Sequence, residues 1–178
     1  MAARRVILVR HAPAVPRDAR RYPDDADRPL RADGRKEFRR AARAIARLVD
    51  GGASIATSPL ARARETAEIL RRALGVRVRP ALWNELEPEG PVAPLLGRVS
   101  RARRRGFSIL VGHEPQFSRL VGYSLFGEAV PPLKVSKGGA IRIDFPEAVK
   151  AGGGRLIWAI TRSQLRTMKG REDDEPDE

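Results

Sequence analysis

The chain has 178 residues, of which 42% are hydrophobic and 32% charged, a size and composition typical of one globular domain with a sizeable core. The absence of cysteine excludes disulfides, thiol chemistry and thiolate metal sites. No apolar run is long enough to span a bilayer or to form the core of an export signal, so we expect a cytoplasmic protein without membrane attachment.

The formal net charge of +13 favours an anionic partner, which could be nucleic acid, an acidic protein or a phosphorylated substrate. Charge alone does not choose among these classes, because arginines spread along predicted helices are also typical of a solvated helix face. Aromatic residues make up only 5% and do not alternate with basic residues, which argues against stacking on single-stranded nucleic acid. We therefore treat nucleic-acid binding as a minor hypothesis.

The first strand is predicted at Val6–Val9, an uninterrupted apolar run of the kind that is buried on both faces of a sheet. Residues 12–31 are rich in proline, aspartate and arginine and indicate an irregular loop. Apolar residues then recur at helical spacing over Asp33–Asp50, and the pair Gly51-Gly52 predicts the end of that helix.

A second short strand is predicted at Ser54–Thr57. Ser58 and Pro59 follow as an N-cap and a proline at the first helical position, which predicts the start of a second helix there. The buried face of this helix is marked by four residues at helical spacing: Ala63, Ala67, Leu70 and Leu74. Val76–Val78 is the candidate third strand.

The second half of the chain continues the alternation of helices and strands. A helix is predicted at Val92–Arg105, with a strongly basic end whose role the sequence leaves open; docking of an acidic partner domain is one hypothesis. Phe107–Val111 repeats the pattern of a buried strand, and Pro115 opens another helix. Ala140–Phe145 and Leu156–Ile160 are predicted to close the sheet.

Strands that alternate with helices predict an α/β fold, a three-layer α/β/α sandwich with a mostly parallel central sheet. We expect one domain over residues 1–170, followed by an acidic, disordered tail at 171–178. Ligands of such sheets bind at the carboxyl ends of the strands. Arg10-His11 follows the first of these strands at that end.

Two further segments are expected at the same edge of the sheet. Gly112-His113 follows another buried strand, and Arg62 lies in the first turn of a helix that follows a third strand. His11 and His113 are the only two histidines in the sequence, so any imidazole chemistry must use one or both of them. Their convergence predicts a site at this edge.

Three ordered segments carry a resemblance to a known family: Leu8-Val-Arg-His-Ala12, Thr57-Ser-Pro-Leu-Ala-Arg-Ala63 and Val111-Gly-His-Glu-Pro115. With Arg28-Pro-Leu30 and Gly34 as further matches, the chain resembles the histidine phosphatase superfamily from about Arg4 to Met168. Within it, the chain looks most like the SixA-type phosphohistidine phosphatases. The resemblance implies a phosphoglycerate mutase-like fold, and residues 75–106 are too few for the large capping insertion of the mutases.

The resemblance implies a phosphatase in which His11 is the nucleophile and forms a phosphohistidine intermediate, while Arg10, Arg62 and His113 form the phosphate pocket. Two arginine forks suit a phosphoryl group, because its transfer depends on positioning and on stabilisation of negative charge. Arginines around a histidine also favour its neutral, nucleophilic form. Arg28 is expected to brace the loop over the site. No metal and no cofactor is implied.

The proton donor is the least defined part of this site. Glu85 follows Asn84, where mutase-like members of the superfamily place their acid, so Glu85 is the candidate general acid; an exposed acidic loop is the alternative. The glycine that usually follows the Arg-His pair is Ala12 here. The loop after it lacks the asparagine with which mutase-like members hold phosphate, which argues against a mutase.

The expected substrate is phosphohistidine on a protein, such as the phosphotransfer domain of a signalling relay. An uncapped site would admit a protein, and the leaving imidazole can already carry a proton. Small phosphate esters are the alternative among enzymes, and a non-catalytic phosphate- or nucleic-acid-binding protein is the alternative outside them. Loss of turnover in His11→Ala would separate an enzyme from a binding protein, and a requirement for Glu85 would indicate ester chemistry.

Overall fold

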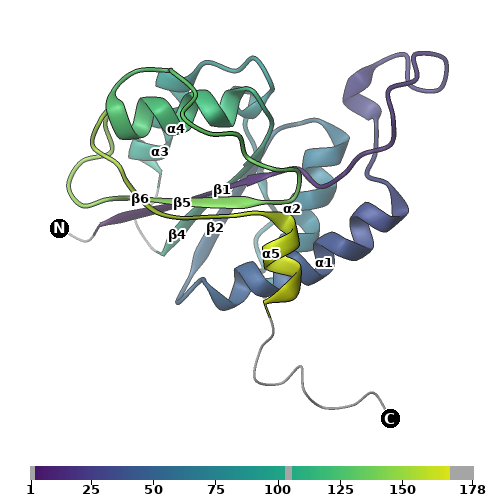
Figure 1. The fold of residues 1–178 in the computed structure, drawn as a ribbon, viewed down its shortest axis with the longest axis horizontal. Coiled ribbons are helices and arrows are strands. Elements are labelled where there is room, and N and C mark those ends of the chain that lie inside the picture. The colour runs from purple at the N-terminus through teal and green to yellow at the C-terminus, as the bar shows by residue number, and fades with distance from the viewer. Residues whose placement is uncertain (1–2, 103–105, 169–178) are drawn as a thin grey trace, which may run out of the picture.

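A six-stranded sheet forms the middle layer of the protein, in the order β3-β2-β4-β1-β5-β6 (Figure 1). The computed structural model describes residues 3–102 and 106–168. The strands are Arg4–Arg10 (β1), Ala53–Thr57 (β2), Ala81–Leu82 (β3), Phe107–Gly112 (β4), Ala140–Phe145 (β5) and Arg155–Ile160 (β6). Strands β1 to β4 pair in parallel, and β5 and β6 pair antiparallel, so the sheet is mostly parallel as predicted.

Helices cover both faces of this sheet. They are Ala32–Arg47 (α1), Ala61–Ala73 (α2), Val92–Arg101 (α3), Gln116–Phe126 (α4) and Arg162–Thr167 (α5), with short 3-10 helices at Asp25–Asp27 (η1) and Asn84–Leu86 (η2). Figure 1 shows α3 and α4 on one side of the sheet and α1, α2 and α5 on the other, and two separate hydrophobic cores match these two sides. The predicted three-layer α/β/α sandwich is confirmed.

The central strand β1 shows why its sequence is apolar without interruption. Ile7 and Val9 lie in the core beneath α1 and α2, while Val6 and Leu8 lie in the core beneath α3 and α4. Because successive side chains of a strand point to opposite faces, a strand covered on both faces needs apolar residues at every position.

Helix α1 has the amphipathic pattern that its sequence predicts. Phe38 and Ile45 are fully buried against the sheet, while the arginines between them face outward. The helix ends at Arg47, before the predicted end at Asp50. Leu48 and Val49 donate backbone hydrogen bonds to carbonyls only three residues back, and this tighter turn closes the helix early.

The predicted start of the second helix is wrong. Helix α2 begins at Ala61 rather than at Pro59, and its N-cap, Leu60, makes no side-chain capping bond. The hydroxyl of Ser58 accepts a hydrogen bond from the backbone N–H of Leu60 at 3.3 Å, so it stabilises a turn that precedes the helix. This turn leaves the Ser58 side chain at the sheet edge.

Other boundaries also differ from the predictions. The third strand is β3 rather than Val76–Val78, because no element buries that run and Val78 is 77% exposed. Helix α3 ends at Arg101, and residues 103–105 of the predicted basic end lie outside the described residues, as does the predicted tail at 171–178. Helix α5 was not predicted; a capping box formed by Thr161 and Gln164 starts it.

Strands β1, β2 and β4 end at the same edge of the sheet, with β4 in the middle. The backbone N–H of His11 donates to the carbonyl of Gly112 at 3.0 Å, and the N–H of Ser58 donates to the carbonyl of Val111 at 3.0 Å. The first residues after these three strands therefore lie side by side, which positions the site.

Only short elements connect α2 to β4 in the described chain, namely β3, η2 and α3. Helix α3 packs in the same core as α4 and the sheet, so it does not form a separate subdomain over the site. This arrangement agrees with the expected absence of a large capping insertion. Within the described residues, no helix has the length and apolar character to cross a membrane.

Candidate active site

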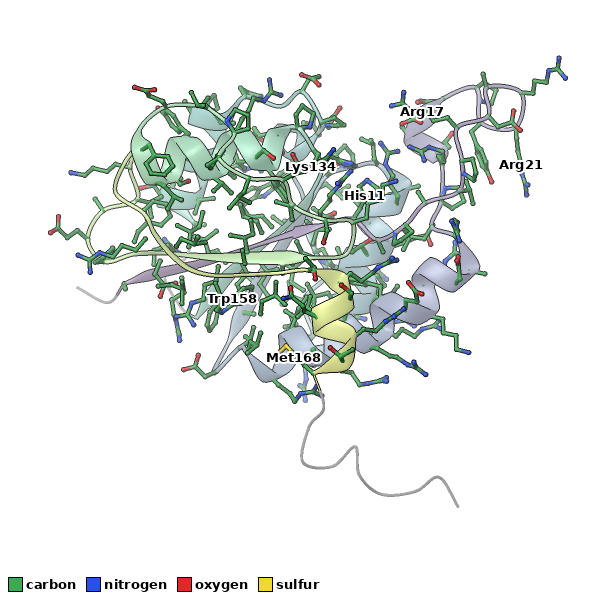
Figure 2. The ribbon with its side chains drawn as sticks, in the orientation of Figure 1. His11, Arg17, Arg21, Lys134, Trp158 and Met168 are labelled. Carbon is green, nitrogen blue, oxygen red and sulfur yellow. The ribbon has the colours of Figure 1, made fainter. Side chains whose placement is uncertain are left out.

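His11 lies at the carboxyl end of β1 and is only 6% exposed. Its ring nitrogen Nδ1 lies 2.7 Å from the backbone carbonyl of Ala12. A carbonyl can only accept, so Nδ1 carries the proton and Nε2 keeps a lone pair. Figure 2 shows His11 near the point where the loop that carries Arg17 and Arg21 leaves the body of the protein.

The electrostatic surroundings keep His11 neutral. Its pKa is lowered to about 3, mainly by burial; the bond to Ala12 opposes this shift, and the positive charges of Arg62, Arg10 and Lys137 add to it. A neutral imidazole with an unprotonated Nε2 is the form that can attack an electrophile.

His113 lies at the end of β4, beside His11. The two ring centroids are 5.0 Å apart. Nε2 of His113 lies 3.0 Å from the hydroxyl of Ser58, while Nδ1 is buried without a partner. When the Ser58 hydroxyl gives its proton to Nε2, the proton of the neutral ring lies on Nδ1, which is then an unused donor.

The pKa of His113 is lowered to about 2 by burial, with smaller contributions from His11 and nearby arginines. His113 is therefore neutral at physiological pH. A neutral histidine can donate one hydrogen bond and places no positive charge beside the neighbouring His11.

Arg62 lies in the first turn of α2 and is 3% exposed. Its Nη1 donates to the backbone carbonyl of Asp25 at 2.8 Å, and its Nη2 lies 3.0 Å from the Asp25 carboxylate. Nε of Arg62 is buried without a partner. Asp25 therefore holds the outer edge of this guanidinium and leaves Nε unused.

Arg10, the residue before His11, is held in a similar way. Its Nη1 donates to the carbonyl of Val135 at 2.9 Å, and its Nε is buried without a partner. The carboxylate of Glu114 accepts from the N–H of Val135 at 2.7 Å and also from Ser118, so it fixes the segment that holds Arg10. Burial lowers the pKa of Arg10, and the charge of Glu114 opposes this shift.

These side chains line one cleft of about 500 Å³. The cleft contains both histidines and six cationic residues: Arg10, Arg17, Arg28, Arg31, Arg62 and Lys137. Glu114 is the only carboxylate among its lining residues. Three residues that line this cleft each have a buried nitrogen without a hydrogen-bond partner. These nitrogens are Nε of Arg10, Nε of Arg62 and Nδ1 of His113. The cleft is therefore suited to a small, highly charged oxyanion.

Arg28 braces the loop over the cleft, as its sequence context predicts. Its Nε bonds the Asp25 carboxylate at 2.9 Å, and its Nη1 donates to the carbonyl of Val15 at 2.7 Å. Burial raises the pKa of Asp25, but the hydrogen bond from Arg28 and the charge of Arg62 outweigh it, so the pKa is lowered. Asp25 therefore stays ionised and links the loop to α2.

The structure does not bring Glu85 to the cleft. The Glu85 carboxylate forms an ion pair with Arg98 of α3 at 2.6 Å, and Glu85 is not among the lining residues. Arg98 in turn lies over the ring of Trp83, at 4.4 Å from its centroid. These contacts hold Glu85 in a surface ion pair.

Sequence reasoning missed four residues of the site, namely Ser58 as a partner of His113, Asp25, Glu114 and Lys137. Glu114 adjoins His113, a signal that could have found it. Asp25 lies in η1 and Lys137 lies in the connection between α4 and β5, and only the tertiary structure brings these segments to the cleft. Among the described residues no group of histidine, aspartate and glutamate side chains is arranged to hold a metal ion.

The fold and the cleft define an α/β protein in which a cationic cleft surrounds a buried, neutral histidine. Residues 6–87 match the family model of the histidine phosphatase superfamily, branch 1. An uncharacterized protein of Picosynechococcus sp. is 35% identical over 147 residues, which are 81% of this chain and 84% of that protein. The chain belongs to the histidine phosphatase superfamily.

Solved structures share the fold. The protein histidine phosphatase SixA, complexed with tungstate, superimposes with a TM-score of 0.75 and 23% identity, over 90% of this chain and 99% of that one. A mutant phosphoserine phosphatase from Entamoeba histolytica, complexed with phosphoserine, has a TM-score of 0.64 and 15% identity, over 90% of this chain and 98% of that one.

Proposed function

We propose that this protein is a metal-independent phosphatase that removes the phosphoryl group from phosphohistidine on a protein. The observation that carries the proposal is the bond from Nδ1 of His11 to the carbonyl of Ala12, which leaves Nε2 as a buried, unprotonated nucleophile in a cationic cleft. Phosphoryl transfer needs positioning and charge stabilisation, and both are available here without a cofactor.

In the proposed reaction, Arg10, Arg62 and His113 bind the phosphoryl oxygens through the N–H groups that have no protein partner. Nε2 of His11 attacks phosphorus and forms a P–N bond, while the bond from phosphorus to the leaving imidazole breaks and that imidazole keeps or takes up a proton. Water then attacks the phosphorylated His11, inorganic phosphate leaves, and the lone pair returns to Nε2.

The position of Glu85 supports phosphohistidine over an ester. An alkoxide leaving group needs an acid, whereas a protonated imidazole leaves without one. The predicted acid is held by Arg98, away from the cleft. An edge without a capping subdomain also supports a protein substrate, such as a cytoplasmic phosphotransfer domain.

Small phosphate monoesters are the second candidate substrates. Glu114 lines the cleft and is the one carboxylate there that could protonate an ester oxygen. If esters are the substrates, Glu114→Gln should lower their turnover, whereas Glu85→Gln should leave it unchanged, because Glu85 contacts Arg98 and not the cleft.

The test compares wild type with His11→Asn, whose amide can still donate to the Ala12 carbonyl. Phosphate release is measured in EDTA from a phosphohistidine-bearing phosphotransfer domain and from p-nitrophenyl phosphate. We expect release from the protein to fall about 10³-fold or more in the variant, with inorganic phosphate still bound.

Three other outcomes would contradict the proposed function. Turnover of the ester alone would favour the small-molecule phosphatase. No turnover of either substrate, with phosphate still bound by wild type, would indicate a binding protein that keeps the fold without catalysis. Turnover that persists in His11→Asn would overturn the assignment of the nucleophile.

A further inference from the structure

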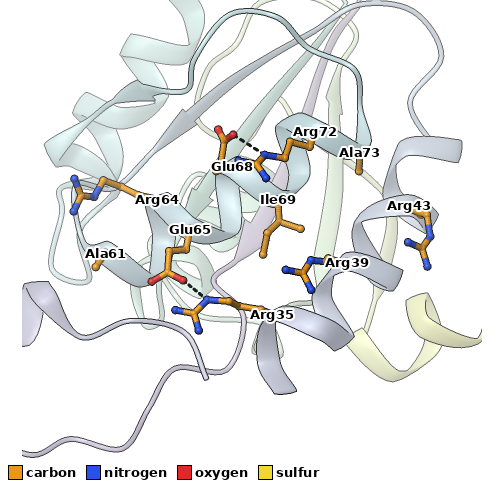
Figure 3. A pocket seen from close by; sticks show the side chains of 10 residues that line it. All are labelled: Arg35, Arg39, Arg43, Ala61, Arg64, Glu65, Glu68, Ile69, Arg72 and Ala73. Atoms are coloured by element: carbon orange, nitrogen blue, oxygen red, sulfur yellow. Dashed lines mark hydrogen bonds and ion pairs between the residues drawn. The ribbon is translucent and has the colours of Figure 1, made fainter. Parts of the chain in front are cut away.

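A second cationic hollow lies outside the active site, between α1 and α2, with a volume of about 670 Å³ (Figure 3). We name it the arginine groove. Its lining residues are Arg35, Arg39, Arg43, Ala61, Arg64, Glu65, Glu68, Ile69, Arg72 and Ala73. Five arginines against two glutamates give this groove a positive charge.

Only two of the five arginines are neutralised within the groove. Arg35 pairs with Glu65 at 2.6 Å and Arg72 with Glu68 at 2.9 Å, and Figure 3 marks both contacts. Three exposed arginines form no ion pair within the described residues, namely Arg39, Arg43 and Arg64. The groove therefore presents three unneutralised cations.

Three arginines of α1 lie along one face of the helix. Arg35, Arg39 and Arg43 are spaced four residues apart, so their side chains are neighbours on one helix face. Like charges at this spacing destabilise a helix. An anion bound in the groove would relieve this repulsion.

The floor of the groove is apolar. Ile69 projects from α2 toward α1 in Figure 3, and Ala61 and Ala73 lie at either end. An apolar floor favours a partner with apolar side chains, and the carboxylates of Glu65 and Glu68 would repel a continuous phosphate backbone. The groove therefore suits a protein with separate acidic groups better than a nucleic acid.

We infer that the arginine groove docks an acidic, amphipathic helix of a partner protein. Arg43 follows Arg35 by eight positions, or about 12 Å of helix axis, which matches about two turns of a partner helix. Carboxylates four residues apart on that helix would meet the α1 arginines, and an apolar side chain between them would cover Ile69. This inference goes beyond the proposed activity and does not depend on it.

The groove adjoins the active site. Glu65, which pairs with Arg35, also accepts from the backbone N–H of Leu30 at 3.3 Å, and the next residue, Arg31, lines the catalytic cleft. A partner helix in the groove would therefore hold the rest of its protein beside the cleft.

The test measures binding by fluorescence anisotropy with the full-length protein. The probe is a fluorescein-labelled, hydrocarbon-stapled helix of about 18 residues, with leucines flanked by glutamates four residues apart on one face. We expect the Kd to rise about tenfold or more in Arg39→Glu/Arg43→Glu. We expect a similar loss when the peptide glutamates become glutamine, and a smaller loss when its leucines become alanine.

The matched control is Lys36→Glu/Arg40→Glu, which changes the net charge equally on the same helix but lies outside the groove. Its Kd should change less than about threefold. Circular dichroism and thermal unfolding confirm that both double variants fold. Equal weakening in the two variants would overturn the docking site, because it would indicate attraction to net charge alone.

Two further outcomes would assign the groove to another occupant. A labelled single-stranded RNA could bind more tightly than the peptide and lose this binding in Arg39→Glu/Arg43→Glu. That result would overturn the proposal that the partner is a protein. The second outcome uses a full-length variant with the acidic residues of 172–178 changed to amides. If the peptide binds only to that variant, the groove belongs to this chain's own acidic residues.

Discussion

At the scale of single residues, hydrogen bonds of the backbone and of Ser58 decide what the two histidines can do. The Ala12 carbonyl fixes the proton of His11 on Nδ1, and Ser58 contacts Nε2 of His113, whose Nδ1 is left without a protein partner. The sequence indicates both histidines and the arginines beside them. It does not indicate which ring nitrogen meets which partner, because Ser58 lies far from His113 in the chain and the His11 ring could turn either nitrogen toward its neighbour Ala12.

The lowered histidine pKa values predict that the folded protein loses stability in mild acid. In the unfolded chain each histidine titrates near 6.5, but in the folded protein His11 titrates at about 3 and His113 at about 2. Between pH 7 and 5 the unfolded state thus gains protons that the folded state does not. The free energy of unfolding should fall by up to about 1.4 kcal/mol per pH unit for each histidine.

Urea unfolding at pH 7 and pH 5 checks this prediction. His113→Gln removes one of the two titrating groups, so its stability should depend less steeply on pH than that of wild type. A pH dependence equal to that of wild type would contradict the neutral, buried state of His113.

At the scale of elements, the contact between α1 and the segment after β1 fixes the position of His11. Gly34 lies in the first turn of α1, and a Cβ there would overlap the carbonyl oxygen of Pro13. Gly34→Ala should therefore push Pro13 and the adjoining Ala12 away from the helix. Because Ala12 holds the His11 ring, we expect loss of activity with a destabilisation of about 1–3 kcal/mol.

Gly97→Ala in α3 is the matched control. Its added Cβ would meet only the flexible end of Arg101, at 3.4 Å. Alanine should therefore stabilise α3 by about 0.5–1 kcal/mol without a change in activity. Urea midpoints and phosphate release measure both variants, and a harmless Gly34→Ala would show that this helix contact does not position the site.

Element boundaries show where local sequence signals fail. The signal of Ser58 and Pro59 is real, but the turn that it stabilises lies before α2 and aims Ser58 at His113. Val76–Val78 has strand-forming residues, yet no neighbouring strand or helix buries it. In both segments, contacts made in the folded protein override the local preference for a helix start or a strand.

At the scale of the whole molecule, the net charge of +13 should speed the encounter with anionic substrates. Salt screens such attraction, with a Debye length of about 10 Å at 0.1 M. For p-nitrophenyl phosphate, kcat/KM should fall about threefold or more when NaCl rises from roughly 0.02 to 0.5 M. The value of kcat should change little, because the proposed phosphate pocket is built from the buried side chains of His11, Arg62 and His113.

Steady-state kinetics across this salt range provides the measurement. An equal fall in kcat would indicate that salt perturbs the site itself rather than the encounter. A protein substrate with an acidic docking surface should show a steeper fall in kcat/KM than the small ester, because more of its charges are screened.

The sequence by itself determined the layer architecture, because strands apolar at every position must be covered on both faces and amphipathic helices must cover them. It also determined the order of the segments that carry Arg10, His11, Arg62 and His113, because the carboxyl ends of parallel strands meet at one edge.

Only the tertiary structure decided which groups complete the site. Asp25 reaches Arg62 across a loop, while Glu85 is drawn to Arg98 and away from the cleft. It also decided that Arg35, Arg39 and Arg43 of α1 line an open groove against α2. These outcomes depend on contacts between residues distant in the chain, and local patterns carry no information about such contacts.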